Sequence, residues 1–204
     1  MFSHKVVSAK PPLSPLPPTS ALDTYLERHI HIPHDCVAMV VSIGCGQARD
    51  FITVIKRFPS VLYVGVDEVD QVIPFPDSLR DVAKQFLFQC CDASIWNADY
   101  TPACILIEHP NIDRCPKNWA DIMVNLLRFF KPDVHSAPVI LVTFFDRCER
   151  NEFKTMLYGH PDLRCAFHIT EDTCESFSHL SLGDRAALIL KRRSPSTPSN
   201  KLFG

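Results

Sequence analysis

The chain has 204 residues, of which 46% are hydrophobic, so it can bury one substantial core but is short for two full domains. Its formal charge of -2 offers no basic face for sequence-independent binding to nucleic-acid phosphates, and its apolar runs are far shorter than a membrane span. Nine cysteines without CxxC spacing, and no charged leader before an apolar segment, favour reduced thiols and a cytoplasmic location.

The two ends of the chain differ in composition from the middle. Residues 8–19, SAKPPLSPLPPT, contain five prolines, which remove amide donors and favour an extended arm. The end, SPSTPSNKLFG, has little to bury. We therefore expect a Pro-rich arm at residues 1–19, a single domain at residues 20–193 and a flexible tail at residues 194–204.

Strand and helix patterns alternate along the middle of the chain. Continuous apolar runs predict buried strands at residues 37–43, 61–66, 86–90, 103–107 and 139–145. Helical stripes predict helices near residues 20–31, 48–58, 79–86, 119–130 and 149–157. The first of these helices begins at a capping-box spacing, Ser20 and Asp23. Such alternation predicts a parallel sheet with helices on both faces.

The last part of the domain has a different pattern. RCAFHI (164–169) and RAALILK (185–191) are two strand candidates with only a weak helical pattern between them. An antiparallel pair at the sheet edge explains this arrangement. The predicted fold is therefore α/β, with three layers and a mostly parallel seven-stranded sheet that ends in a C-terminal antiparallel strand pair.

The sequence GCGQA follows the first predicted strand directly. In open parallel sheets, ligands bind beyond the carboxyl ends of the strands, which is where this turn lies. Gly44 can adopt a backbone conformation closed to other residues, and Gly46 lets a ligand approach the main chain. We expect a helix that begins near Gln47 to point its first amides at that ligand.

Acidic residues follow the next two predicted strands. Asp67 and Glu68 end the second strand, and Asp67 lies 21 residues after Gly46 (67 − 46), the spacing of a carboxylate that binds ribose hydroxyls. Asp92 and Ala93 follow the third strand, where they could contact an adenine. A glycine turn and two acids at neighbouring strand ends predict a nucleoside pocket. Capping of the following turns is the other interpretation of these acids.

The sequences VVSIGCGQA, YVGVDEVD, FQCCDAS and ACILIEHPN resemble four motifs of the class I S-adenosylmethionine-dependent methyltransferases. The resemblance spans roughly residues 37–191. It implies a Rossmann-like methyltransferase fold with S-adenosylmethionine as cofactor, whose methionine portion, ribose and adenine would lie along the three strand ends. By that resemblance the cofactor-binding residues are Gly44, Cys45 and Gly46 for the methionine portion, Asp67 with the adjacent Glu68 for the ribose, and Asp92 with Ala93 for the adenine.

Two positions depart from the family pattern. Ala48 stands where a third glycine is usual, which is a common replacement. After the fourth strand the chain has Glu108, His109, Pro110 and Asn111 in place of the Asn or Asp, two prolines and aromatic residue of many nitrogen methyltransferases. His109 is the candidate general base, because an imidazole titrates near neutral pH. Glu108 is the candidate ligand of the methionine ammonium or of the acceptor, and simple loop hydrogen bonding is the alternative for both residues.

The predicted activity is methyl transfer to an oxygen or nitrogen of a small molecule or peptide. A non-catalytic binding module with the same fold, acting through the proline-rich arm, and a nicotinamide-dependent oxidoreductase are the alternatives. Nucleic-acid methylation has support only from the basic tail KRRSPSTPSNK, and the oligomeric state is left open. We expect no metal site, because the spacing of His29, His31, His34 and Cys36 matches no recurrent zinc motif. Trp96 is a candidate either for covering the adenine or for the core.

Overall fold

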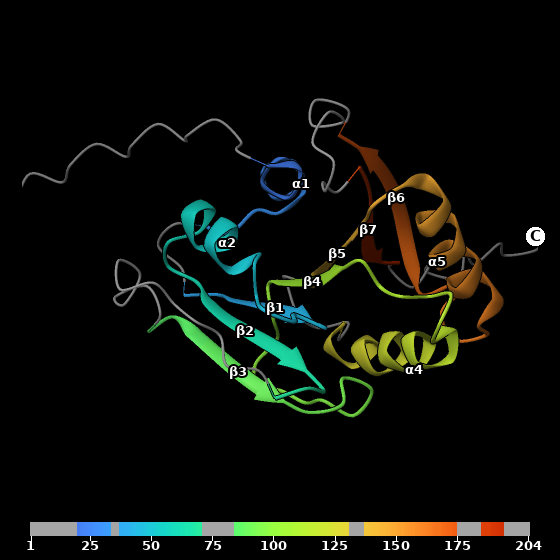
Figure 1. Ribbon diagram of the computed structural model, residues 1–204, viewed down its shortest axis with the longest axis horizontal. Coiled ribbons are helices and arrows are strands. Elements are labelled where there is room, and N and C mark those ends of the chain that lie inside the picture. The colour runs from blue at the N-terminus through green and yellow to red at the C-terminus, as the bar shows by residue number, and fades with distance from the viewer. Residues whose placement is uncertain (1–19, 34–36, 71–83, 131–136, 175–184, 194–204) are drawn as a thin grey trace, which may run out of the picture.

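The computed structural model describes residues 20–33, 37–70, 84–130, 137–174 and 185–193. These residues form one seven-stranded sheet with helices on both faces (Figure 1). The strands are β1 (Met39–Ile43), β2 (Leu62–Asp67), β3 (Phe86–Cys90), β4 (Cys104–Glu108), β5 (Val139–Phe144), β6 (Phe167–Thr173) and β7 (Ala186–Arg192). The helices are α1 (Ala21–His29), α2 (Phe51–Arg57), α4 (Pro116–Leu126), the short 3₁₀ helix η2 (Leu127–Phe129) and α5 (Arg147–Gly159).

The strand order is β3-β2-β1-β4-β5-β7-β6. The first five strands pair in parallel, and β7 runs antiparallel between β5 and β6. The predicted mostly parallel sheet with an antiparallel C-terminal pair is therefore confirmed. The order reverses at β1, because β1 lies between β2 and β4, and ligands bind at such switch points.

The core lies on both faces of the sheet, which explains why the central strands are apolar without alternation. Helices α1 and α2 cover one face, and α4 and α5 cover the other (Figure 1). Along β1, Val40 packs toward α1 and α2, whereas Val41 packs toward α4 and α5. Because successive side chains of a strand point to opposite faces, both faces must be apolar in a sheet that is covered twice.

Helix α1 begins where the capping-box spacing predicts, directly after Ser20. The Ser20 hydroxyl accepts a hydrogen bond from the backbone N–H of Asp23 at 3.1 Å. The Asp23 carboxylate accepts a hydrogen bond from Arg57 at the end of α2 at 2.8 Å. This ion pair joins the two helices of the same layer.

The start of α2 differs from the prediction. The helix begins at Phe51 and not near Gln47, because Ala48 has a left-handed backbone with φ of +48° that a helix cannot contain. The first amides of α2 therefore lie beyond the glycine turn. Of the helix predicted near residues 79–86, residues 79–83 lie outside the described residues and Phe86 belongs to β3.

Other boundaries shift by a few residues. Helix α4 begins at Pro116, earlier than the apolar stripe that starts at Trp119, since proline is favoured in the first helical turn. Strand β6 begins at Phe167, because residues 161–166 form turns after α5. Pro132, expected to end α4, lies outside the described residues.

A buried polar network lies under the start of α2. The Tyr63 hydroxyl donates to both carboxylate oxygens of Asp50, at 2.6 and 2.7 Å, and its ring packs against Phe51 and Phe86. Burial raises the pKa of Asp50, and the hydrogen bonds from Tyr63 and Ser42 oppose this shift. The same burial, together with the carboxylate, holds the pKa of Tyr63 well above its ordinary value. A carboxyl group is thus retained in the core because two hydroxyls satisfy it.

We predict that Tyr63→Phe lowers the free energy of unfolding by about 1–3 kcal/mol, because it leaves a buried carboxylate without its main donor. The substitution also removes a bond that lowers the pKa of Asp50, so that pKa rises further. The native state then binds a proton more tightly than the unfolded chain does, and stability falls as the pH rises through that range.

Urea unfolding at about pH 5 and about pH 8 measures both effects, and the loss is larger at the higher pH. Tyr158→Phe is the matched control, since Tyr158 is exposed on α5 and its hydroxyl supports no buried group. Equal stability of Tyr63→Phe and Tyr158→Phe would contradict the prediction.

Candidate active site

The glycine turn doubles back onto the end of β2. The backbone N–H groups of Gly44 and Cys45 both donate to the carbonyl oxygen of Val66, at 2.8 and 3.2 Å. Gly44 and Gly46 have φ of +67° and +49°, in the left-handed region that favours glycine. The two glycines are therefore required by the path of the backbone, as the sequence predicts.

The space beside the turn is open at Gly46. A Cβ built at Gly46 would meet no heavy atom within 4 Å, so the main chain is accessible to a ligand there. A Cβ built at Gly44 would lie 3.7 Å from Cη2 of Trp119, which comes from the first turns of α4. A backbone left bare in this way fits a cofactor that approaches the turn closely.

Asp67 closes the turn from the end of β2. One carboxylate oxygen accepts from the N–H of Gly46 at 2.8 Å, and the other accepts from the N–H of Val69 at 3.0 Å. A carboxylate has about four acceptor sites, so Asp67 can hold the backbone and still accept from the hydroxyls of a sugar. Turn capping and ribose binding are therefore compatible roles for this residue.

The side chain of Cys45 points toward the sheet. A Cβ built at Gly65 of β2 would lie 2.8 Å from its Sγ, so the thiol occupies the space that the missing Gly65 side chain leaves. Burial raises the pKa of the Cys45 thiol to about 12, and the nearby Asp50 and Asp67 carboxylates add to the shift. The thiol is neutral, and Cys45 offers its backbone to the turn.

The turn after β3 is held by α4. The Asp92 carboxylate accepts from the N–H of Ser94 at 2.7 Å. The side-chain amide of Asn125 donates to the carbonyl oxygens of Ala93 and Trp96, at 2.8 and 3.0 Å. Trp96 is 3% exposed and belongs to the core, so it does not cover a ligand. Asp92 and Ala93 thus lie in a fixed turn at the carboxyl edge.

Two exposed apolar residues follow these acids, and the sequence analysis did not identify them. Val69 is 56% exposed and Ile95 is 75% exposed, and each comes two or three residues after Asp67 or Asp92. Glu68, between Asp67 and Val69, is exposed. Apolar side chains directly after two acids at strand ends are the signal that would have identified Val69 and Ile95.

His109 has a constrained position after β4. Its backbone is left-handed, with φ of +49°, and its N–H donates to the carbonyl of Thr143 at 3.0 Å. Its imidazole stacks on the Phe145 ring at 3.5 Å between centroids, and its Nδ1 lies 4.0 Å from a Glu149 carboxylate oxygen. A non-glycine residue in this region carries backbone strain, which is common at functional sites. Glu108 is half-buried at the end of β4, opposite Thr143 of β5.

Phe145 is a further residue that the sequence did not indicate, and Glu149 lies in the segment after the fifth strand that we expect beside an acceptor. They follow β5, about 35 to 40 residues after His109, and only the pairing of β4 with β5 brings them together. Glu149 also accepts from the N–H of Phe145 at 2.9 Å, which fixes the start of α5. His109, Phe145 and Glu149 therefore form one connected cluster.

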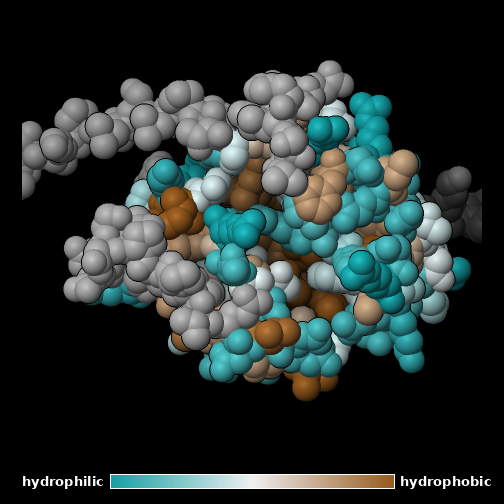
Figure 2. Space-filling view, viewed as in Figure 1, coloured by the Kyte–Doolittle hydropathy of each residue, from teal (hydrophilic) through white to brown (hydrophobic). Residues whose placement is uncertain are grey.

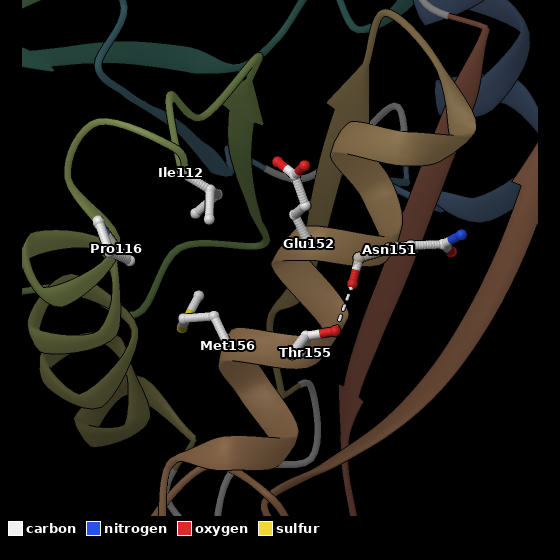
Figure 3. Close-up of a pocket in the computed structure, with 6 residues that line it drawn as sticks. All are labelled: Ile112, Pro116, Asn151, Glu152, Thr155 and Met156. Atoms are coloured by element: carbon white, nitrogen blue, oxygen red, sulfur yellow. Dashed lines mark hydrogen bonds between the residues drawn. The ribbon is translucent and has the colours of Figure 1, made fainter.

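An open cavity of about 400 Å³ lies between the start of α4 and α5 (Figure 3). In Figure 3 the side chains of Ile112 and Met156 face each other across it, and Glu152 stands at its rim. The two segments that form this cavity also carry His109 and Glu149. Figure 2 shows apolar atoms on the floor of a hollow in this view of the surface, with polar side chains around it. The residues that line the cavity are Ile112, Pro116, Asn151, Glu152, Thr155 and Met156.

The described residues contain no group of three or more His, Cys, Asp and Glu side chains that could hold a metal ion. His29, one of the four residues considered for zinc, instead contacts Asp172 of β6 at 2.6 Å through its Nε2. His34 and Cys36 lie outside the described residues. No helix in the described part of the chain is long and apolar enough to cross a membrane.

No protein-family profile matches the sequence. No curated protein matches it in sequence either.

Solved structures of methyltransferases are similar to this chain in fold. A precorrin-6y C5,15-methyltransferase from Geobacter metallireducens GS-15 has a TM-score of 0.52 at 14% identity, covering 85% of this chain and 86% of its own. An rRNA methylase from Streptococcus thermophilus has a TM-score of 0.56 at 10% identity, covering 88% and 99%. A glycopeptide N-methyltransferase has a TM-score of 0.58 at 10% identity, covering 86% and 92%, and it has also been solved with S-adenosylmethionine. By its strand order and these similarities, the chain has the class I methyltransferase fold.

Proposed function

We propose that the protein is an S-adenosylmethionine-dependent methyltransferase that acts on an oxygen or nitrogen of a small molecule or peptide. The observation that carries the proposal is the bare backbone at Gly46, closed by Asp67, at the switch point of the sheet. The antiparallel β7 supports a methyltransferase over a nicotinamide-dependent oxidoreductase, whose sheet follows the order 3-2-1-4-5-6.

The bound cofactor would supply a methyl group on a positively charged sulfur. The acceptor would attack the methyl carbon in line, and the sulfur would leave as a neutral thioether. The protein has to align the acceptor, exclude water and accept a proton if the acceptor carries one. In this proposal the backbone of Gly44, Cys45 and Gly46 binds the methionine portion, Asp67 with the adjacent Glu68 the ribose, and Asp92 with Ala93 the adenine. Val69 and Ile95 would contact the adenine faces, since both are exposed and apolar.

His109 is the proposed general base. The Phe145 ring and the Glu149 carboxylate hold its imidazole at the carboxyl edge, with Nδ1 on the side of the carboxylate. At 4.0 Å the Glu149 carboxylate lies beside Nδ1, at a distance longer than a hydrogen bond. Nε2 is then the atom that takes the acceptor proton. Glu108, beside it, would bind the ammonium of the cofactor or orient the acceptor.

A small acceptor is favoured over a nucleic acid. The cavity between the start of α4 and α5 has a volume of about 400 Å³, within the range of small-molecule pockets. The net charge of -2 gives no electrostatic support for a nucleic-acid substrate. The similar structures are methyltransferases of a precorrin, an rRNA and a glycopeptide, so their shared fold does not select one acceptor.

Calorimetry tests the cofactor assignment. We predict that the protein binds S-adenosylmethionine and S-adenosylhomocysteine but not NAD. Asp67→Asn weakens S-adenosylhomocysteine binding by about tenfold or more, because it removes a charged acceptor and leaves one backbone N–H facing an amide donor.

Asp70→Asn is the control for that variant, since Asp70 is exposed three residues further along the same loop. It should bind the ligand as the unmodified protein does. Binding of NAD alone would support an oxidoreductase, and unchanged affinity in Asp67→Asn would reject the proposed ribose contact. Binding without methyl transfer to any acceptor in a screen with a labelled donor would support a non-catalytic module.

The second prediction concerns the general base. With an acceptor that attacks through a neutral hydroxyl, His109→Gln lowers kcat by about a hundredfold to ten-thousandfold, because the substitution removes the group that takes the proton. The affinity for S-adenosylhomocysteine stays the same, since His109 lies outside the proposed cofactor contacts. Steady-state kinetics and calorimetry measure the two quantities separately.

His168→Gln is the matched control, because His168 is exposed on β6. Its kcat should equal that of the unmodified protein. A His109→Gln enzyme with full activity on a hydroxyl acceptor would show that the imidazole only stabilises the loop.

A further inference from the structure

Trp119 differs from its neighbours at the start of α4. The three residues before it, Pro116, Lys117 and Asn118, are exposed, whereas Trp119 is half-buried and packs beside the core cluster of α4 and α5. The apolar stripe of the sequence explains this position as a core contact. The structure also places the indole beside the glycine turn, because a Cβ built at Gly44, an atom that glycine lacks, would lie 3.7 Å from its Cη2.

The edge of the indole therefore faces the side of Gly44 from which a side chain would project. Gly44 already requires glycine for its positive φ, and its missing side chain also lets the aromatic ring approach the backbone. Two residues further along the turn, the space beside Gly46 is open. A ligand that lies along this turn thus has bare backbone on one side and an aromatic ring beside it.

We propose that Trp119 is a cofactor-contacting residue whose indole forms a cation–π contact with the sulfonium of S-adenosylmethionine. This inference rests on the proposed function, in which the methionine portion lies along Gly44 to Gly46. The ring of a tryptophan attracts a cation more strongly than other aromatic side chains do, and the attraction grows when water is excluded. The product of methyl transfer has a neutral sulfur, so the same ring favours the substrate over the product.

Trp96, the other tryptophan of the chain, provides a comparison because its indole has a structural role in the core. Trp96 is 3% exposed, packs against Phe129 at 5.3 Å between ring centroids, and its Nε1–H bonds to Gln89. Trp119 is more exposed and lies at the turn. The chain has only these two tryptophans, so each can be followed separately by fluorescence.

Binding of three ligands to Trp119→Leu and Trp119→Phe tests the contact. We expect Trp119→Leu to weaken S-adenosylmethionine and its positively charged amine analogue sinefungin by about three- to tenfold. The neutral S-adenosylhomocysteine should lose less than about twofold by the same reasoning. Trp119→Phe should fall between Trp119→Leu and the unmodified protein, and it provides the comparison if the leucine variant does not fold.

An equal loss for all three ligands would overturn the proposal, because it would indicate a packing or adenine contact. No loss for any ligand would overturn it as well. If the unmodified protein binds none of the three ligands, the proposed function itself fails. This outcome differs from an equal loss in the variants and from no loss in the variants, both of which reject only the role of Trp119.

Fluorescence provides a readout that does not depend on activity. In Trp96→Phe, Trp119 is the only indole, and we expect saturating S-adenosylmethionine to change its emission. In Trp119→Phe, with Trp96 as the only indole in the core, the change should disappear while calorimetry still detects binding. A signal that remains in Trp119→Phe and is lost in Trp96→Phe would contradict the placement of Trp119 at the ligand.

Discussion

The hydrogen bond between the Gly46 N–H and the Asp67 carboxylate is the interaction on which the candidate site depends. It joins the end of β1 to the end of β2, and the carbonyl of Val66 strengthens the junction by accepting from two further amides of the turn. A charged acceptor forms a stronger bond with a backbone N–H than a neutral one does. Because the turn is closed from the side of β2, the other side of Gly46 stays open.

The glycine turn is also supported by residues on its core side, and some of these residues are polar. Asp50 and Tyr63 are held together under α2, and the Cys45 thiol fills the space above Gly65. The two carboxyl groups nearest the turn therefore have different surroundings. Burial raises the pKa of Asp50, which is satisfied by hydroxyls, whereas Asp67 accepts from backbone amides at the edge. Only the second is positioned to meet a ligand.

The sheet could be predicted from the sequence, because strands that are buried on both faces consist of continuous apolar runs. The positions of Gly44, Gly46 and Asp67 at the carboxyl edge of the sheet could be predicted for a similar reason, since all three lie close in sequence to a strand end. The start of α2 could not be predicted, because the positive φ of Ala48 cannot be recognised from the pattern of apolar residues. The contacts of Phe145 and Glu149 with His109 could not be predicted, because only strand pairing brings these residues together.

Helix α4 connects the parts of the site that the sheet edge alone would leave separate. Near its start, Trp119 reaches the glycine turn, and near its end Asn125 holds the turn that contains Ala93. These two positions are roughly 9 Å apart along the helix axis. The loop that carries His109 precedes the same helix, but the imidazole itself is positioned by Thr143, Phe145 and Glu149. In the proposed function, a displacement of α4 would therefore disturb the glycine turn and the turn after β3 together, since a packed helix moves as one unit.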